Sequence, residues 1–250
     1  MSGGSTMIKD LLTSLKMKGA LEVLKDIDHL KDRDQFLIAL LKAEADDRDT
    51  RANKRRLAQA KLPTNKEWRD IDPELNPEIE FSKVEKLGNG LFIQNKENVC
   101  LMGQQGTGKT HSLTALARDL CRKGFTSRFY TASALVNFLE EAKAGHTLTK
   151  VMQTLVRPDL LIIDELGFVP FSENGARLLF DVFASRYEKG SIAVSTNLSF
   201  DKWVEVFGTP ELTAALVDRF THKCMTLNYQ GKSVRFLDAK KQKEELKLVP

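Results

Sequence analysis

A glycine-rich run near the middle of the chain has the residue types of a phosphate-binding loop. The run is Gly103-Gln104-Gln105-Gly106-Thr107-Gly108-Lys109-Thr110, and it matches the pattern G-x-x-x-x-G-K-[ST]. Its glycines allow successive backbone N–H groups to point toward one anion, and a helix that starts near Lys109 adds partial positive charge. Lys109 would contact the β- and γ-phosphates, and the Thr110 hydroxyl would be a ligand of Mg²⁺. The run therefore predicts a site for a nucleoside triphosphate with magnesium.

Two acidic residues and one amide follow later apolar runs and complete this predicted site. Residues 160–163 (LLII) end in Asp164 and Glu165, where unpaired carboxylates would be costly to bury. Asp164 is expected to organise Mg²⁺ through coordinated water, and Glu165 to orient and deprotonate the water that attacks the γ-phosphate. Asn197 ends a further strand and would hold that water or contact the γ-phosphate. The alternative for Asn197 is a turn-forming residue that caps the next segment.

The elements that must position these residues alternate between strand and helix from residue 98 onward. Short apolar runs at 99–102, 127–131, 160–163, 192–194 and 224–227 predict strands. Helical spacing predicts helices near 109–123, 133–145, 148–156, 173–190 and 209–220. This alternation predicts an α/β fold in which a parallel sheet carries helices on both faces. The strand that ends in Asn197 should lie beside both the phosphate-loop strand and the Asp164 strand.

Residues 7–75 are predicted to form a small all-α domain followed by a linker. Apolar spacing indicates two short helices on either side of Gly19, then a longer helix from about Asp34 to Lys61. Prolines at positions 63, 73 and 77 mark the linker, and we place the domain boundary near residue 75. Residues 1–6 are expected to be an artificial extension in front of a native start at Met7.

The second half of the long helix is strongly basic, which bears on the partner. Five of the eleven residues from 51 to 61 are basic and none is acidic. Such a stripe suits contacts with DNA phosphates. A solvated helix face with i,i+4 ion pairs, such as Asp47 with Arg51, is the alternative. The candidate DNA-binding residues here are Arg48, Arg51, Lys54, Arg55, Arg56 and Lys61.

Composition limits the class of protein. Hydrophobic residues make up 42% of the 250, enough for a full core, and no apolar run approaches the roughly 18 residues of a membrane span. The net charge of +4 is too small to indicate a nucleic-acid partner by itself. Cys100, Cys121 and Cys224 lack the spacing of a metal site, which favours reduced core thiols in a cytoplasmic protein.

Four runs together resemble the IstB/DnaC branch of the AAA+ ATPases. They are Gly103–Thr110 with the following His111, residues 161–167 (LIIDELG), residues 195–197 (STN) and residues 216–220 (LVDRF). The resemblance covers residues 7 to about 237, with an AAA+ domain at 76–237 and a charged tail at 238–250. The basic helix ending in Ala60-Lys61-Leu62-Pro63 looks more like that of the IstB-type insertion-sequence transposition helpers than like the helicase loaders.

This resemblance implies an ATP-dependent, DNA-binding oligomer that prepares duplex target DNA and stimulates a partner transposase. ATP and Mg²⁺ would lie between subunits, with His111 part of the nucleotide site. In the family pattern Arg219 is an arginine finger that reaches the γ-phosphate in a neighbouring subunit. Its alternative is a salt bridge with Asp218. Arg235 resembles an arginine sensor within the same subunit, and the source of the adenine contacts stays open.

The resemblance also suggests a second surface for nucleic acid. Residues 131–158 correspond to a helical insertion, in which Lys143, Thr147 and Lys150 lie around the Gly145 turn and could meet phosphates. A plain solvated helical hairpin is an equal alternative. Two other functions stay open for the whole chain. One is a replicative helicase loader that acts on single-stranded DNA, and the other is a scaffold that binds ATP without turning it over.

Overall fold

A computed structural model gives the fold and describes residues 2–75, 79–231, 233 and 234. The chain divides into two compact units, Met1–Arg55 and Arg56–Pro250, and each is described by itself. The division falls well before the boundary that the sequence placed near residue 75. Residues after Arg55 belong to the second unit because they pack on it. Leu62 and Trp68 contact its core, and Arg56 Nε donates to the Cys121 carbonyl oxygen over 2.7 Å.

The first unit consists of helices around a small core. Gly19 lies against the long helix, where an added Cβ would be 2.4 Å from the Ala43 carbonyl oxygen. The backbone N–H groups of Gly19 and Ala20 donate to the buried Glu44 carboxylate over 3.0 and 3.4 Å. This carboxylate fixes the start of the second helix on the third. The helices, which agree with the predicted short pair and long helix, are α1 (Ser2–Ser14), α2 (Lys18–Val23) and α3 (Arg33–Ala60).

Helix α3 has 28 residues, long enough to span a membrane, but it is rich in charged residues. Its apolar residue Leu40 instead serves the small core of the first unit. Within the part of the chain that the structure describes, no helix is both long and apolar enough to cross a membrane.

The second unit is built on a sheet whose strand pairs are all parallel, in the order β2-β3-β4-β1-β5. Residues 160–163 of β3 are fully buried, as expected of a central strand that is covered on both sides. The predicted parallel α/β sheet is thereby confirmed. The strands are β1 (Asn98–Gly103), β2 (Ser127–Thr131), β3 (Leu160–Leu166), β4 (Ser191–Thr196) and β5 (Cys224–Tyr229).

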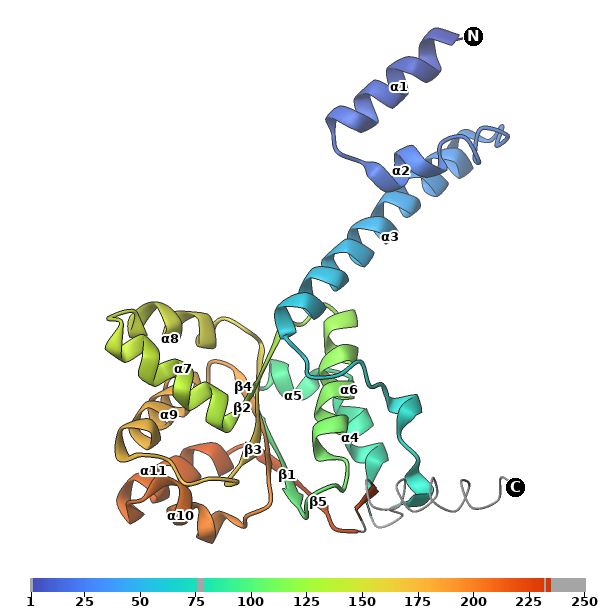
Figure 1. Cartoon of the computed structure of the whole chain (residues 1–250). Coiled ribbons are helices and arrows are strands. Elements are labelled where there is room, and N and C mark those ends of the chain that lie inside the picture. Colours follow the sequence, from blue (N-terminus) through green and yellow to red (C-terminus); the bar gives the residue numbers. More distant parts are fainter. Residues whose placement is uncertain (1, 76–78, 232, 235–250) are drawn as a thin grey trace, which may run out of the picture. The chain divides into compact units, whose positions relative to one another are not determined.

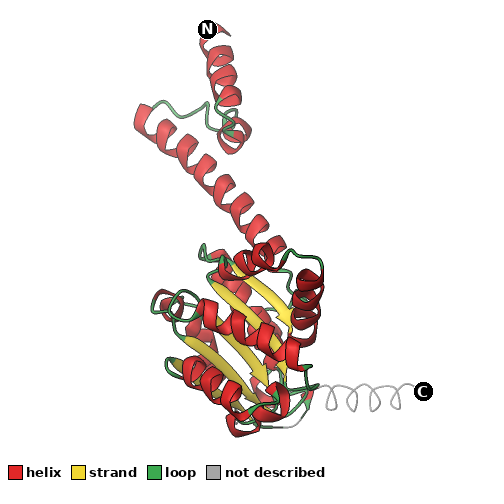
Figure 2. Cartoon of the chain, turned by 90° about the vertical axis from the view of Figure 1, so that its left-hand side faces the viewer, coloured by secondary structure: helices red, strands yellow, loops and turns green. Residues whose placement is uncertain are grey.

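Helices cover both faces of this sheet (Figures 1 and 2). Leu113 and Leu116 belong to the apolar cluster on one face, and Leu179 and Phe183 to the cluster on the other. The first face carries α4 (Phe81–Leu87), α5 (Leu91–Gln94) and α6 (Lys109–Arg122). The second carries α7 (Ala132–Ala144), α8 (Leu148–Val156), α9 (Glu173–Arg186), α10 (Val204–Phe207) and α11 (Pro210–Thr221). The described residues of the unit also form the 3₁₀ turns η1 (Trp68–Asp70), η2 (Pro73–Leu75) and η3 (Phe200–Trp203).

Two local features differ from the expectation. Helices α4 and α5 lie in residues 81–94, for which no helix was predicted, and they form because Val84, Phe92 and Ile93 are buried in the core beside α6. Thr131 caps α7, since its hydroxyl accepts a hydrogen bond from the Ala134 backbone N–H over 3.2 Å. The helix therefore begins at Ala132, one residue before the start of the range 133–145 that the sequence predicts.

Candidate nucleotide site

The predicted phosphate-binding loop links the end of β1 to the start of α6. Gly108 is the N-cap residue of α6, with φ of 99°, and no described side chain caps this helix. The amide groups of its first turn are therefore available to an anion. The Gly106 carbonyl oxygen accepts a hydrogen bond from Val234 N–H over 2.9 Å. A Cβ at Gly106, where φ is 76°, would lie 2.2 Å from the Ser233 hydroxyl oxygen, so the position requires glycine.

Lys109 folds back onto the loop. Its Nζ donates to the carbonyl oxygens of Gly103 and Gln104 over 2.7 and 2.6 Å. These two bonds hold the ammonium group and leave its third proton for a phosphate oxygen. Burial lowers the pKa of Lys109, and the carboxylates of Asp164 and Glu165 partly offset that effect. A bound triphosphate would add negative charge and favour the protonated form further.

Asp164 is held by hydroxyl groups from two other elements. Thr110 Oγ1 donates to Oδ2 over 2.8 Å, and Ser195 Oγ donates to Oδ1. Because Asp164 is only 2% exposed, these bonds replace the water that a buried carboxylate loses. Thr110 and Asp164, the two residues expected to bind magnesium, are thus in direct contact.

A β-bulge in β3 brings a second carboxylate to the same place. The register with β4 shifts between Ile163 and Leu166, so that Asp164 and Glu165 both lie opposite Ser195. Glu165 has φ of 60°, and its N–H donates to Ser195 Oγ over 3.0 Å. In a regular strand, neighbouring side chains point to opposite faces of the sheet. The bulge instead allows Asp164 to meet Thr110 while Glu165 lines the pocket.

Lys109, Thr110, Glu165 and Ser195 line one pocket of about 530 Å³ at the carboxyl edge of the sheet. Its volume suits a small-molecule ligand of nucleotide size. Strand β4 lies between β1 and β3, as predicted, and Asn197 directly after it lines the pocket together with Glu165. The loop contributes Gln105 to the lining, whereas Thr107 is buried and donates to the Gln104 carbonyl oxygen over 2.9 Å.

Two parts of the pocket were not predicted from the sequence. Ser195 orients both acidic residues, but a serine within an apolar strand carries no signal of that role. The second part is a segment before η2 that we name the linker wall, residues 64–70. Its residues Thr64, Lys66 and Asp70 line the pocket beside His111. His111 Nε2 is 3.0 Å from the Glu67 carbonyl oxygen, so His111 contacts this wall.

Comparison with known proteins agrees with this geometry. A family model described as "IstB-like ATP binding protein" matches residues 12–244. This chain belongs to the IstB-like family. Membership supports ATP as the nucleotide, and it confirms the resemblance that the four sequence runs indicated.

Sequence relatives of this IstB-like protein come from insertion sequences. It is 34% identical over 213 residues to the assigned ATP-binding protein of IS5376 in Geobacillus stearothermophilus, an alignment that covers 85% of each chain. It is 35% identical over 207 residues to the corresponding IS21 protein of Pseudomonas aeruginosa, which covers 83% of this chain and 78% of that one. The family is therefore shared over most of the chain.

Solved structures with a similar fold include replication proteins. The DnaC helicase loader matches this IstB-like chain with a TM-score of 0.54 and 18% identity, over 69% of this chain and 98% of that one. AMPPCP-bound DnaA from Aquifex aeolicus matches with a TM-score of 0.56 and 22% identity, over 76% of this chain and 58% of that one. These likenesses establish the AAA+ fold.

Arg219 lies at the edge of the sheet opposite the pocket. Helix α11 ends just before β5 starts, and Asn98 Nδ2, at the start of β1, donates to the Phe220 carbonyl oxygen over 3.0 Å. The Arg219 guanidinium lies over the Phe180 ring, 5.1 Å from its centroid. Among the described residues no salt bridge joins Arg219 to Asp218. Arg235 and the tail expected at 238–250 lie outside the described residues.

Within the first unit, four of the candidate DNA-binding residues of α3 line a hollow of about 660 Å³ together with Lys16. Two of the four are in ion pairs, since Arg48 contacts Glu44 and Arg51 contacts Asp47, each over 2.6 Å. The ion pair between Asp47 and Arg51 that the sequence suggested is thus present. The other two, Lys54 and Arg55, are exposed, and no carboxylate in the described part of the chain pairs with them.

The remaining candidate DNA-binding residues belong to the second unit. Arg56 Nε is engaged by the Cys121 carbonyl oxygen, so this residue helps to pack the end of α3. Lys61 is exposed and has φ of 50°, where the helix has ended. Lys143 donates to Asn174 Oδ1, while Thr147 and Lys150 are exposed at the same end of the α7–α8 hairpin. The structure brings these last three together but leaves them apart from the nucleotide pocket.

Proposed function

We propose that this IstB-like protein is an ATPase that assembles with copies of itself on duplex DNA and assists a transposase. Binding of ATP follows from its family, whereas hydrolysis, assembly, DNA binding and action with a transposase are the proposal. ATP binding would favour assembly on DNA, and hydrolysis would favour release.

The observation that carries hydrolysis is the hydrogen-bonded chain from Thr110 through Asp164 and Ser195 to Glu165. Both oxygens of Asp164 accept hydrogen bonds from hydroxyl groups. The exposed Glu165 is therefore the carboxylate that can take a proton from water. Asn197 lines the pocket beside it and offers an amide to the same water or to the γ-phosphate.

The pocket also fits magnesium. The Thr110 hydroxyl and the Asp164 carboxylate are oxygen donors of the kind that magnesium prefers, and they lie 2.8 Å apart. Bound Mg²⁺ would supply positive charge to the phosphates. Lys109 and the free amides of the first turn of α6 would hold the phosphate oxygens while Glu165 accepts the proton.

Glu165→Gln tests hydrolysis, because it keeps the size of the side chain and removes the base. We expect turnover to fall by about 10²- to 10³-fold, the usual contribution of a general base, with ATP affinity retained. The matched control is Glu173→Gln, an exposed glutamate at the start of α9. If Glu165→Gln bound ATP and matched the turnover of the parent, the scaffold alternative would be correct instead.

Support for assembly comes from the place of Arg219. The six residues of β1 separate the two edges of the sheet by about 17 Å, which is more than an arginine side chain spans. Arg219 therefore cannot serve the pocket of its own chain. A guanidinium at this edge can complete the pocket of a neighbouring copy, and hydrolysis would then depend on assembly.

A mixing experiment tests this arrangement. Lys109→Ala removes the phosphate contact and Arg219→Ala removes the finger, so each variant alone should lack turnover. Random mixing at equal amounts would pair an intact pocket with an intact Arg219 at about a quarter of the interfaces, and turnover should recover to a similar fraction. Arg177→Ala, on the exposed face of α9, is the control that should stay active. If the mixture stays inactive, Arg219 does not act between copies.

Support for DNA binding comes from the basic hollow of the first unit. Five cations and one carboxylate, Asp49, line it: the cations are Lys16, Arg48, Arg51, Lys54 and Arg55. The ion pairs with Glu44 and Asp47 hold two of the guanidinium groups in place but also lower the net charge that reaches a phosphate. Lys54 and Arg55 should therefore contribute most of the affinity, through contacts that do not depend on base sequence.

The test replaces both Lys54 and Arg55 with glutamine and measures duplex binding over a range of salt. Each lost phosphate contact should reduce the slope of log K against log salt by about 0.9. The matched control replaces Arg33 and Lys42, exposed cations of the same helix outside the hollow. Binding that is insensitive to salt, or that survives the first pair unchanged, would contradict this surface.

The choice of partner rests on the relatives. The chain is 34–35% identical to proteins named for insertion sequences and 18% identical to the DnaC helicase loader. A transposase encoded by the same insertion sequence is therefore the partner we propose. Capture experiments with that transposase and with the replicative helicase distinguish the transposition function from the helicase-loader function. Each capture is carried out with duplex DNA and with single-stranded DNA. Retention of the helicase with single-stranded DNA would favour the loader alternative.

A further inference from the structure

We propose that Asp70 recognises the nucleoside half of the bound nucleotide and that Glu67 positions the segment that carries it. The inference rests on ATP binding at this pocket. It adds a specificity-determining residue from the linker wall, which lies outside the phosphate-binding loop and the strand ends. The ligand group that Asp70 would contact is a hydrogen-bond donor, either a ribose hydroxyl or the exocyclic amine of adenine.

The first argument is the charge of the lining. Lys109 and the loop amides suit the phosphates, but Asp70 lines the same pocket with a carboxylate. A carboxylate beside a triphosphate is repelled by it. Asp164 and Glu165 lie near the phosphates because they would serve magnesium and the attacking water, and Asp70 has neither role. A third carboxylate is favourable next to an uncharged part of the ligand that carries hydrogen-bond donors, as acidic residues are at the ribose in other nucleotide sites. Asp70 therefore marks the end of the pocket that receives the nucleoside.

The second argument is the orientation of Asp70. Its Oδ2 accepts a hydrogen bond from the Glu67 backbone N–H over 2.8 Å. This hydrogen bond lowers the pKa of Asp70, and the charges of Lys66 and Arg69 lower it further, so the carboxylate stays ionised. No hydrogen-bond donor in the described part of the chain contacts Oδ1. That oxygen can accept from the ligand.

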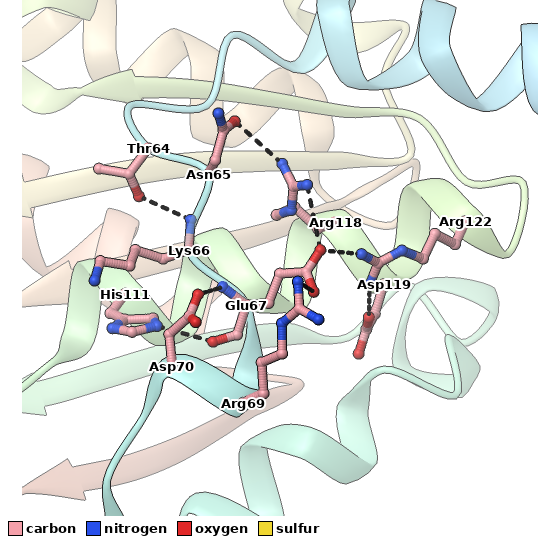
Figure 3. A network of polar contacts seen from close by, with 10 residues as sticks. All are labelled: Thr64, Asn65, Lys66, Glu67, Arg69, Asp70, His111, Arg118, Asp119 and Arg122. Atoms are coloured by element: carbon pink, nitrogen blue, oxygen red, sulfur yellow. Dashed lines mark hydrogen bonds and ion pairs between the residues drawn. The ribbon is translucent and has the colours of Figure 1, made fainter.

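The third argument is the way Glu67 fastens the linker wall to α6 (Figure 3). Its carboxylate pairs with Arg122, and with Arg118 over 3.3 Å, while its carbonyl oxygen lies 3.0 Å from His111 Nε2. Burial is the largest influence and raises the pKa of Glu67, but the hydrogen bonds and charges of Arg122, Arg69 and Arg118 together outweigh it, and the net shift is downward. The glutamate is therefore charged, as these contacts require.

Figure 3 shows that the linker wall contacts the pocket with one side and α6 with the other. The side chains of Lys66 and Asp70 lie on the same side as His111, which lines the pocket, whereas the Glu67 carboxylate points the other way toward Arg118 and Arg122. One side of the linker wall thus faces the ligand and the other is attached to α6. Glu67 touches no part of the ligand and is a positioning residue.

Trp68 extends the attachment along the same helix. Its Nε1 donates to Asp119 Oδ2 over 2.6 Å. The contacts on α6 come from positions 111, 118, 119 and 122, which lie on one face of a helix with 3.6 residues per turn. Because α6 begins at the phosphate-binding loop, the linker wall and the loop are held by the same helix. The separation between phosphate and nucleoside contacts is therefore set within α6.

The test compares ATP with inorganic tripolyphosphate, which has no nucleoside. Asp70→Asn removes the charge and one of the two acceptor oxygens. We expect its ATP affinity to fall about 10-fold, as for loss of a hydrogen bond to a charged group, while tripolyphosphate affinity stays within about twofold. Asp72→Asn is the matched control, since Asp72 is exposed and does not line the pocket.

Two analogues identify the donor. If it is a ribose hydroxyl, the parent should bind 2′,3′-dideoxy-ATP more weakly than ATP, and Asp70→Asn should lose that preference. If the donor is the adenine amine, the parent should bind inosine triphosphate more weakly than ATP, and Asp70→Asn should again lose that preference. An Asp70→Asn variant that binds ATP like the parent, or that loses ATP and tripolyphosphate equally, would overturn the inference. These measurements need no turnover, so failure of the proposed hydrolysis would leave them unchanged.

Glu67→Gln tests the positioning role. A displaced linker wall should lower ATP affinity by about threefold to 10-fold and weaken discrimination against the responsive analogue, with tripolyphosphate binding unaffected. A purely structural contact would change stability without changing discrimination. Glu74→Gln, in the nearby η2 turn, is the control. Discrimination equal to that of the parent in Glu67→Gln would show that Glu67 does not position Asp70.

Discussion

The two halves of the nucleotide pocket are built in different ways. The phosphate half comes from short unbroken runs at the carboxyl ends of β1, β3 and β4, which neighbour one another in the sheet. The nucleoside half that we propose comes from the linker wall, which the sheet does not hold. Its position depends on polar contacts with α6 between residues 44 to 55 apart in the sequence.

Because of this difference, substitutions in the two halves should affect the binding of different ligands. Parallel pairing brings the strand ends together whatever residues follow them, so the phosphate half follows from the fold itself. The linker wall depends on individual side-chain pairs, each worth about 1–3 kcal/mol at most. Substitutions in the first half should therefore affect every phosphate ligand. Substitutions in the second should affect only ligands that carry a nucleoside.

The largest effect should come from Lys109→Ala in the phosphate half. The variant loses a charged contact with the phosphates, and we expect affinity for ATP and for tripolyphosphate to fall together by about 100-fold. Calorimetric titration with both ligands measures this. Loss of ATP binding alone would break the division of the pocket, because it would mean that Lys109 acts on the nucleoside.

Ser195→Ala should have the next largest effect, and on turnover rather than on binding. Without the hydroxyl, Asp164 loses one hydrogen bond and the Glu165 N–H loses its acceptor. We expect kcat to fall about 10-fold, with KM changed by less than about threefold, because the base is misplaced while the loop is intact. Steady-state ATPase assays, with Ser185→Ala on α9 as control, test this. An unchanged kcat would show that the bulge holds Glu165 without Ser195.

Trp68→Phe should have a smaller effect, confined to the nucleoside half. It removes the hydrogen bond to Asp119 and keeps most of the apolar contact. The free energy of unfolding should fall by about 1 kcal/mol, and ATP affinity by about threefold, without change in tripolyphosphate affinity. Denaturant unfolding and the paired titrations measure both. A matching loss of tripolyphosphate affinity would indicate that α6, rather than the linker wall, had moved.

The smallest expected effect concerns pH. The folded-state pKa values of Glu67 and Asp70 are lowered, so the stability that their contacts add is present above the ordinary carboxyl pKa and is lost as pH falls through the folded value. The difference in unfolding midpoint between the parent and Glu67→Gln should thus shrink from neutral pH to about pH 3. A difference that grows on acidification would contradict the assigned charges.

The phosphate half could be predicted from the sequence because its signals are local. Eight consecutive residues define the loop, and apolar runs that end in Asp164 or Asn197 indicate strand ends. Alternation of strand and helix then predicts the sheet that brings them together, and the structure confirms that β4 lies between β1 and β3. The order of these strands is what places Asn197 near the loop.

The linker wall could not be predicted in the same way. Glu67 and Asp70 follow no period, and their role appears only when residues of α6 far along the chain contact them. The polar residues of that helix face, such as Arg118, resemble an ordinary solvated surface in the sequence. The division into units after Arg55 also depends on a long-range contact, that of Arg56 with Cys121, which the sequence does not reveal.

The bulge at Glu165 has a consequence for the stability of the whole unit. A glutamate with φ of 60° occupies a conformation that costs roughly 1 kcal/mol for a residue with a long side chain and less for asparagine. Replacement by Gln keeps this strain, whereas replacement by Asn relieves part of it, and both remove the charge. The Asn variant should therefore unfold at a higher temperature than the Gln variant, although both should turn over ATP far more slowly than the parent. At position 165, the residue that catalysis requires would then be less stable in this backbone conformation than a residue that cannot catalyse the reaction.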